Sequence, residues 1–315
     1  MDYSEFNDSV SDLDEGSYAG LPIVSVPERK GQKIPAAGGA AWRISVTPYE
    51  KVEAFEEQFT LFLEEVDTTE VKAVIIGERP DPVDGEDAVV RSLVDNASRF
   101  PALRSLFLGA MRQEICEISW IEHGDVTPLL EAFPLLERLE VRGSEGLRLR
   151  PIRHGNLRIL RFESGGLPVE VVRGVGACDL PALEYLELWF GMLEYGGDAT
   201  VEDLEPILSG GRLPALRHLG LQNSEIQDEI AAAVASAPVV ARLESLSLSM
   251  GSLTDTGAEA LLSGQPLTHL RRLDLHHHFL SDAMMSRVRK ALPGAETDLS
   301  GRERTSGPGY VAVAE

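Results

Sequence analysis

The chain has 315 residues, of which 43% are hydrophobic and 25% are charged, and its formal net charge is −22. This composition is typical of a globular protein, and no apolar run approaches the roughly 20 residues that a membrane-spanning helix needs. The negative charge argues against binding to nucleic acids or anionic membranes. It favours a basic protein partner, although charge of this size also simply keeps a protein soluble.

The cysteines and the first residues indicate a reducing compartment. Cys116 and Cys178 are too few for a disulfide framework and lack the C-x-x-C spacing of a metal or redox site. The opening stretch MDYSEFNDSVSDLDEGSY contains acidic but no basic residues, and no apolar core of a signal peptide follows it. We therefore expect a cytoplasmic protein with two reduced cysteines.

The two ends of the chain differ in pattern from its middle. Residues 1–40 are acidic and then rich in Pro and Gly, which predicts a flexible arm. Residues 41–70 contain an alternating stretch followed by apolar residues at helical spacing, which predicts a β-α cap over the first repeat. Residues 301–315 predict a flexible C-terminal tail.

Between these ends, one apolar pattern recurs, and the segment from Leu243 to Leu262 shows a complete copy. Leu243, Leu246, Leu248 and Leu253 follow the pattern L-x-x-L-x-L-x-x-x-x-L, and Thr254-Asp255 then opens an Ala/Leu-rich helical run. The pattern starts again at Val71, Leu103, Leu136, Leu157, Leu183, Leu216, Leu243 and Leu270. Because one such unit cannot bury its own apolar face, we expect the copies to stack over residues 71–300.

The last three connecting segments share a finer motif. Ile226-Gln-Asp228, Leu253-Thr-Asp255 and Leu280-Ser-Asp282 each precede a helical stretch, in which Thr or Ser can cap the helix. Over roughly residues 71–299, the chain resembles the ribonuclease-inhibitor-like subclass of leucine-rich repeat proteins, most closely from Leu183 onward. It is also similar to a group of small bacterial leucine-rich repeat proteins of unassigned function. The resemblance implies an α/β solenoid, a horseshoe with a concave parallel sheet and convex helices.

The residues that flank the inward leucines would form rows across the concave sheet, with neighbouring strands about 4.8 Å apart. The first row contains Ser105, Arg138, Ile159, Tyr185, His218, Ser245 and Arg272. The second row contains Phe107, Glu140, Arg161, Glu187, Gly220, Ser247 and Asp274. The third row contains Gly109, Arg142, Glu163, Trp189, Gln222, Ser249 and His276.

We expect a partner-binding surface in these rows, centred on the repeats from Leu136 to Leu221. Arg and Glu alternate between neighbouring strands and can pair, and exposed Tyr and Trp beside Arg are typical of binding hot spots. The expected partner-binding residues are Arg138, Glu140, Arg142, Arg161, Glu163, Tyr185, Glu187, Trp189, His218 and Gln222. In the alternative interpretation, Trp189 packs against a neighbouring loop and the ion pairs only satisfy one another.

Candidates for chemistry are weak. The run His276-His277-His278, with Asp274 and Asp282 nearby, is the most conspicuous metal candidate, but strand alternation sends consecutive residues to opposite faces. The acidic segment 81–87 lacks the ligand spacing of a calcium loop. The common nucleotide, hydrolase and metalloprotease motifs do not occur. We therefore expect no catalytic, cofactor-binding or metal-binding residue.

The leading hypothesis is a non-catalytic protein–protein interaction module that binds a basic protein partner on its concave face, as a monomer or in a hetero-complex. The alternative is an accessory or activating subunit of an enzyme, either a GTPase activator or a component of a biosynthetic complex. No motif matches such activators residue by residue, so no site is carried over. A third hypothesis is self-association through an uncapped end of the solenoid.

Overall fold

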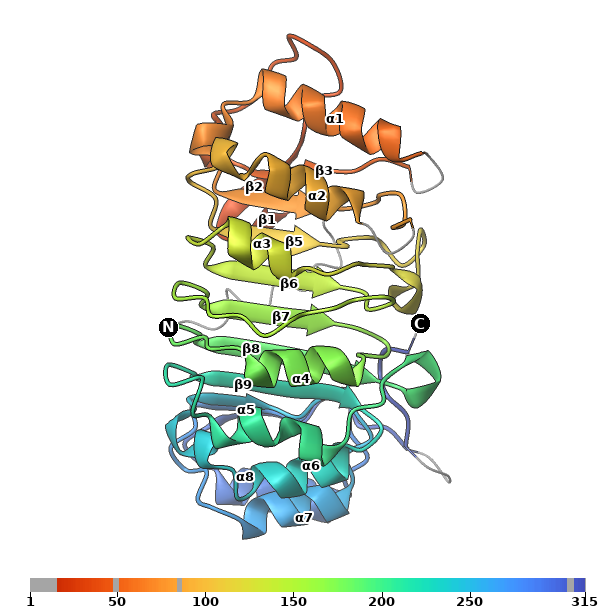
Figure 1. Ribbon diagram of the computed structural model, residues 1–315. Helices are drawn as coiled ribbons and strands as arrows, with labels where there is room; N and C mark the ends of the chain where they lie inside the picture. Colours follow the sequence, from red (N-terminus) through yellow and green to blue (C-terminus); the bar gives the residue numbers. More distant parts are fainter. Residues whose placement is uncertain (1–15, 48–50, 84–86, 305–308, 315) are drawn as a thin grey trace. The chain divides into compact units, whose positions relative to one another are not determined.

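The computed structural model describes residues 16–47, 51–83, 87–304 and 309–314 (Figure 1). The chain divides into two compact units, residues 1–148 and 149–315, and in each of them strands alternate with helices. The boundary lies in the part of the chain where the spacing of the leucine pattern is least regular. Among the described residues, no helix is both long enough and apolar enough to span a membrane.

The first unit contains a sheet whose described strands follow one another in chain order. The strands are β1 (Ser17–Tyr18), β2 (Leu21–Ser25), β3 (Ala41–Ile44), β4 (Ala73–Ile76), β5 (Ser105–Leu108) and β6 (Arg138–Arg142). The β1–β2 pair is antiparallel, and all later pairs in this unit are parallel. The connecting helices are α1 (Val52–Glu65), α2 (Ala88–Asp95) and α3 (Thr127–Ala132), with 3-10 turns at Ala37–Gly39, Thr68–Glu70, Ala97–Arg99 and Ile118–Trp120.

The second unit is more regular, and its described strands all pair in parallel and in chain order. They are β7 (Ile159–Glu163), β8 (Tyr185–Gly191), β9 (His218–Ser224), β10 (Ser245–Ser247), β11 (Arg272–Asp274) and β12 (Glu296–Asp298). The helices are α4 (Val169–Ala177), α5 (Glu205–Ser209), α6 (Gln227–Val234), α7 (Asp255–Ser263) and α8 (Asp282–Ala291), with 3-10 turns at Leu193–Tyr195, Val201–Leu204 and Pro238–Arg242. The expectation of stacked strand–helix units with parallel strands is confirmed, which makes this a repeat-like α/β fold.

The leucines of the pattern form the core of the second unit. Side chains alternate between the two faces of a strand, so the two paired leucines of each copy point to the same side. The fully buried set includes Leu160, Leu186, Leu188, Leu219, Leu221, Leu246, Leu248, Leu273 and Leu275. This face packs against the connecting segments, and the opposite face carries the alternate residues.

The Ser/Thr-Asp motif has two functions in the structure. Thr254 and Ser281 cap α7 and α8, because their side chains accept hydrogen bonds from the backbone N–H groups of Thr256 and Met284. The aspartate that follows also links neighbouring units. Asp255 accepts a hydrogen bond of 2.7 Å from the backbone N–H of Ser281, which fixes one helix start against the next.

Part of the segment expected to be a flexible arm forms strands, β1 and β2. Strands β1 and β2 extend the sheet beyond β3, so β3 and α1 form as expected but are not its outer edge within the described residues. The Tyr18 ring is buried 6.0 Å from the Phe107 ring, and the Arg138 guanidinium lies 4.8 Å above it. Residues 1–15 lie outside the described part of the chain.

The described part of the expected C-terminal tail also contacts the second unit. Asn223 accepts a hydrogen bond of 2.9 Å from the backbone N–H of Val313 and donates one of 2.6 Å to its carbonyl oxygen. The backbone N–H of Ala312 donates to the carbonyl oxygen of Met250. Residues 309–314 are therefore held by directed backbone contacts.

Candidate functional site

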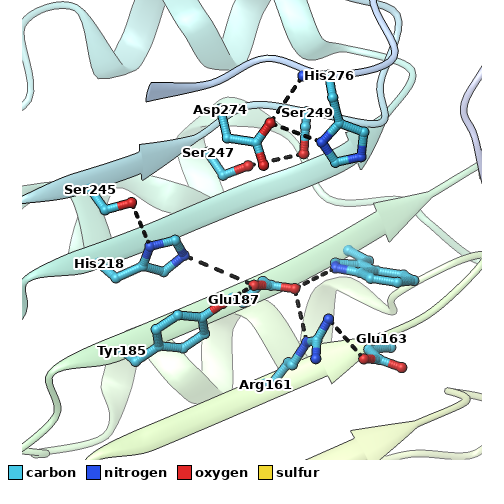
Figure 2. A network of polar contacts seen from close by, with 11 residues as sticks. Arg161, Glu163, Tyr185, Glu187, His218, Ser245, Ser247, Ser249, Asp274 and His276 are labelled. Carbon is cyan, nitrogen blue, oxygen red and sulfur yellow. Dashed lines mark hydrogen bonds and ion pairs between the residues drawn. The ribbon is translucent and has the colours of Figure 1, made fainter. Parts of the chain in front are cut away.

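The strands of the second unit present the rows that the sequence predicted. Along the first row, Tyr185 pairs in register with His218, His218 with Ser245 and Ser245 with Arg272. The second row runs through Arg161, Glu187, Gly220, Ser247 and Asp274, and the structure extends it to Asp298. We call this side of the sheet, opposite the buried leucines, the polar face. Figure 2 shows part of this face.

Glu187 is the centre of a hydrogen-bond network on the polar face (Figure 2). Its carboxylate accepts a bond of 2.9 Å from Arg161 Nε, one of 2.8 Å from Trp189 Nε1 and one from the Tyr185 hydroxyl. Arg161 also contacts Glu163 at 3.0 Å, and its guanidinium lies 5.5 Å from the centre of the Trp189 ring. The expected charge pairing between neighbouring strands is present, and it fixes the half-buried indole of Trp189.

Tyr185 differs from its expected role as an open contact residue. It is only 3% exposed, and its ring stacks on the His218 imidazole with the centroids 4.0 Å apart and the planes 7° from parallel. Adjacent parallel strands bring these two rings together, since they are register partners. Tyr185 therefore packs within the polar face and supports Glu187.

His218 is a neutral, buried histidine. Burial lowers its pKa to about 3, the positive charges of Arg272 and Arg161 also lower it, and the negative charge of Asp274 opposes them. Its Nδ1 lies 3.0 Å from Ser245 Oγ. The imidazole therefore joins two strands through an uncharged hydrogen bond.

The order Ser245, His218, Glu187 has the residue types of a hydrolytic triad, but the geometry does not support that chemistry. The distance from His218 Nε2 to Glu187 Oε2 is 3.9 Å, which is too long for a hydrogen bond. Ser245 is 1% exposed, and an imidazole whose pKa is near 3 is a weak base at neutral pH.

The polar face ends in an acidic corner at β11 and β12. The Nδ1 of His276 lies 2.8 Å from Asp274 Oδ1, and the backbone N–H of His276 donates to the same oxygen. The hydrogen bond with Asp274 and the negative charges of Asp274 and Asp298 raise the pKa of His276. One ligand atom from each of these three side chains lies within 4.8 Å of the others.

The run His276-His277-His278 does not converge on one point, but strand alternation is not the reason, because β11 ends at Asp274 and the three histidines follow it. Nε2 of His277 lies 3.1 Å from the carbonyl oxygen of Tyr310, and that of His278, which is buried, lies 3.2 Å from the carbonyl oxygen of Leu299. The sequence rows stopped at β11, so Asp298 was missed. The leucine pattern does not mark β12, because Thr297 stands where β11 has its inward Leu273.

The remaining expected contact residues are distributed over both units. In the first unit, buried Arg138 is paired with Glu140 and lies over the Tyr18 ring. Arg142 donates a bond of 3.3 Å to the carbonyl oxygen of Met111 and lies 5.8 Å from the Phe107 ring centre. In the second unit, Glu163 and Gln222 are buried.

Comparisons with known proteins place the chain in a family without giving it an activity. The stacked strand–helix units define a repeat-like α/β protein with parallel strands, and one side of its sheet is the polar face. No family model and no curated protein matches the chain. A crystal structure of a Bacteroides fragilis protein from a structural-genomics consortium matches with 31% sequence identity and a TM-score of 0.75, over 85% of this chain and 76% of that chain. The chain belongs to the same family as that protein, which is described by its source alone.

Proposed function

We propose that the chain is a leucine-rich repeat interaction module without catalytic activity, and that it binds a basic protein partner on the polar face. The class is supported by stacked strand–helix units whose buried leucines occupy the repeat positions. The observation that carries the binding proposal is that Glu187 holds Trp189 and Arg161 in place through direct hydrogen bonds.

Such pre-organisation favours binding. A flexible side chain loses about 0.5–1.5 kcal/mol of conformational freedom when a partner fixes it. Trp189 has already lost much of that freedom, because its Nε1 donates to Glu187 and its ring lies beside Arg161. An indole that remains partly exposed on a rigid support is the kind of side chain that dominates binding energies, with typical losses of about 2 kcal/mol or more on truncation.

The charge of the polar face favours a basic partner. Asp274 and Asp298 stand side by side at its acidic corner, and the neighbouring His276 side chain is 38% exposed. The chain as a whole carries a net charge of −22, which attracts a basic partner over a distance and accelerates association. We place this binding in the cytoplasm, where free Cys116 and Cys178 would stay reduced, with the chain as a monomer or in a hetero-complex.

The test is affinity capture from the native cell, followed by a measured dissociation constant for the captured partner. Three forms are compared: the unchanged chain, Trp189→Ala, and Trp120→Ala as the matched control. Trp120 is 56% exposed and lies on a 3-10 turn of the first unit. We expect Trp189→Ala to weaken binding about 30-fold, which corresponds to about 2 kcal/mol, while Trp120→Ala changes it less than about twofold. Equal affinity of all three forms would refute the proposal.

A further inference from the structure

The acidic corner of the polar face places two carboxylates in direct register. Asp274 on β11 and Asp298 on β12 are partners in a parallel pair, so both side chains stand on the polar face. Like charges directly opposite each other are destabilising unless a cation lies between them. His276, two residues after Asp274, projects from the same side and has an imidazole nitrogen among the three ligand atoms within 4.8 Å.

The spacing of Asp274 and His276 within the corner suits two ligands of one metal ion. Zinc binds imidazole nitrogen at about 2.0–2.1 Å and carboxylate oxygen at about 2.0–2.2 Å, which puts two neighbouring ligand atoms roughly 3 Å apart. Asp274 Oδ1 and His276 Nδ1 are 2.8 Å apart. An ion could therefore bind these two side chains with little movement of either, while the Asp298 carboxylate, within 4.8 Å of both ligand atoms, would close on it as the third ligand.

Backbone groups hold both carboxylates in orientation. The N–H of His276 donates a bond of 3.0 Å to Asp274 Oδ1, and the N–H of Ser300 donates one of 2.9 Å to Asp298 Oδ1. Hydrogen bonds from outside the ligand set are a regular feature of metal sites, because they fix the direction of the ligand lone pairs. The corner is also accessible, since the His276 side chain is partly exposed.

We propose that Asp274, His276 and Asp298 form a binding site for one divalent transition-metal ion of the zinc type, with water completing its coordination. One nitrogen and two carboxylate ligands suit zinc or cobalt. Magnesium and calcium prefer six or more oxygen ligands and are the discriminating control ions. In the competing explanation, a protonated His276 and nearby Arg272 balance the two carboxylates, and no ion binds.

The experiment is calorimetric titration of the tag-free chain with Zn²⁺, and separately with Mg²⁺. The forms compared are the unchanged chain, His276→Gln, Asp298→Asn and the matched control His277→Gln. The control removes the adjacent imidazole, whose Nε2 contacts the Tyr310 carbonyl oxygen and not the acidic corner. We expect one Zn²⁺ per chain and no measurable Mg²⁺ binding. Affinity for Zn²⁺ should fall at least about tenfold in His276→Gln and Asp298→Asn and stay unchanged in His277→Gln.

Titration with Co²⁺ gives a second readout, because its visible absorption reports an imidazole-containing site of low coordination number. This band should appear in the unchanged chain and in His277→Gln and disappear in His276→Gln. Near-UV circular dichroism establishes whether each variant is folded. If His276→Gln does not fold, the Zn²⁺ affinity of Asp298→Asn tests the proposal. Absence of stoichiometric Zn²⁺ binding to the unchanged chain would overturn the proposal, as would unchanged affinity in the folded ligand variants.

Discussion

Replacement of Glu187 by alanine tests the network at the centre of the polar face. The substitution removes the carboxylate that accepts hydrogen bonds from Arg161, Tyr185 and Trp189. Removing one partner of a buried ion pair typically costs about 3–5 kcal/mol, because the other charge stays buried. Because Arg161 keeps its ion pair with Glu163, we expect the free energy of unfolding to fall by about 3 kcal/mol, at the lower end of that range. Urea titration followed by circular dichroism measures it.

The chain offers a matched control in the same two repeats, where each partner lies three residues earlier in the sequence. Arg158 and Glu184, which directly precede β7 and β8, pair at 2.9 Å and have the same separation in sequence, but their side chains are 39% and 29% exposed. Solvent-exposed pairs contribute only about 0–1 kcal/mol, so Glu184→Ala should have a small effect. The reasoning is refuted if Glu187→Ala costs less than about 1 kcal/mol, or no more than Glu184→Ala.

Three further predictions concern the second unit. Because burial holds the pKa of His218 near 3, against about 6.5 in the unfolded chain, its neutral ring supports folding above pH 6.5. As the pH falls from 6.5 toward 3, the free energy of unfolding should drop by up to about 1.4 kcal/mol per pH unit. Urea titrations at several pH values measure this slope, and His218→Gln should reduce it. An unchanged slope would contradict the neutral state of buried His218. Gly191 has a φ of +68°, and an added Cβ would collide with the Gly165 carbonyl. Gly191→Ala should therefore lower the free energy of unfolding, measured in urea, by at least about 2 kcal/mol, whereas Gly211→Ala, where nothing lies near the added Cβ, should have almost no effect. Equal losses in the two variants would contradict the close contact at Gly191. Asn223→Ala should accelerate hydrogen exchange in the C-terminal segment that it binds, and unaltered exchange would show that this contact is not needed.

The leucine pattern was sufficient to predict most of the sheet. A period-two strand of paired leucines has only one face that can be buried, so the flanking residues must stand on the other face. Register followed from aligning the leading leucines, which is why Tyr185, His218 and Ser245 lie in the predicted row. The parallel direction followed from the helical connections.

What the sequence did not predict depends on contacts between distant segments. The composition of residues 16–40 predicted a flexible arm. In the structure Tyr18 packs against Phe107, which is far away in the sequence, and no pattern near Tyr18 indicates that contact. Burial of Tyr185 likewise depends on its stack with His218 and could not be inferred from its own strand. Asp298 joined the polar face through a short final strand without leucines, which pattern matching overlooks.

The central claim, that the polar face binds a partner, is tested most directly by oxidative footprinting of the unchanged chain with and without the captured protein. Trp189 is the reporter on the polar face, exposed Trp120 is the internal reference, and fully buried Trp42 gives the baseline. The account predicts that the partner protects Trp189 from oxidation and leaves Trp120 unaffected. Unchanged oxidation of Trp189 in the saturated complex would contradict it.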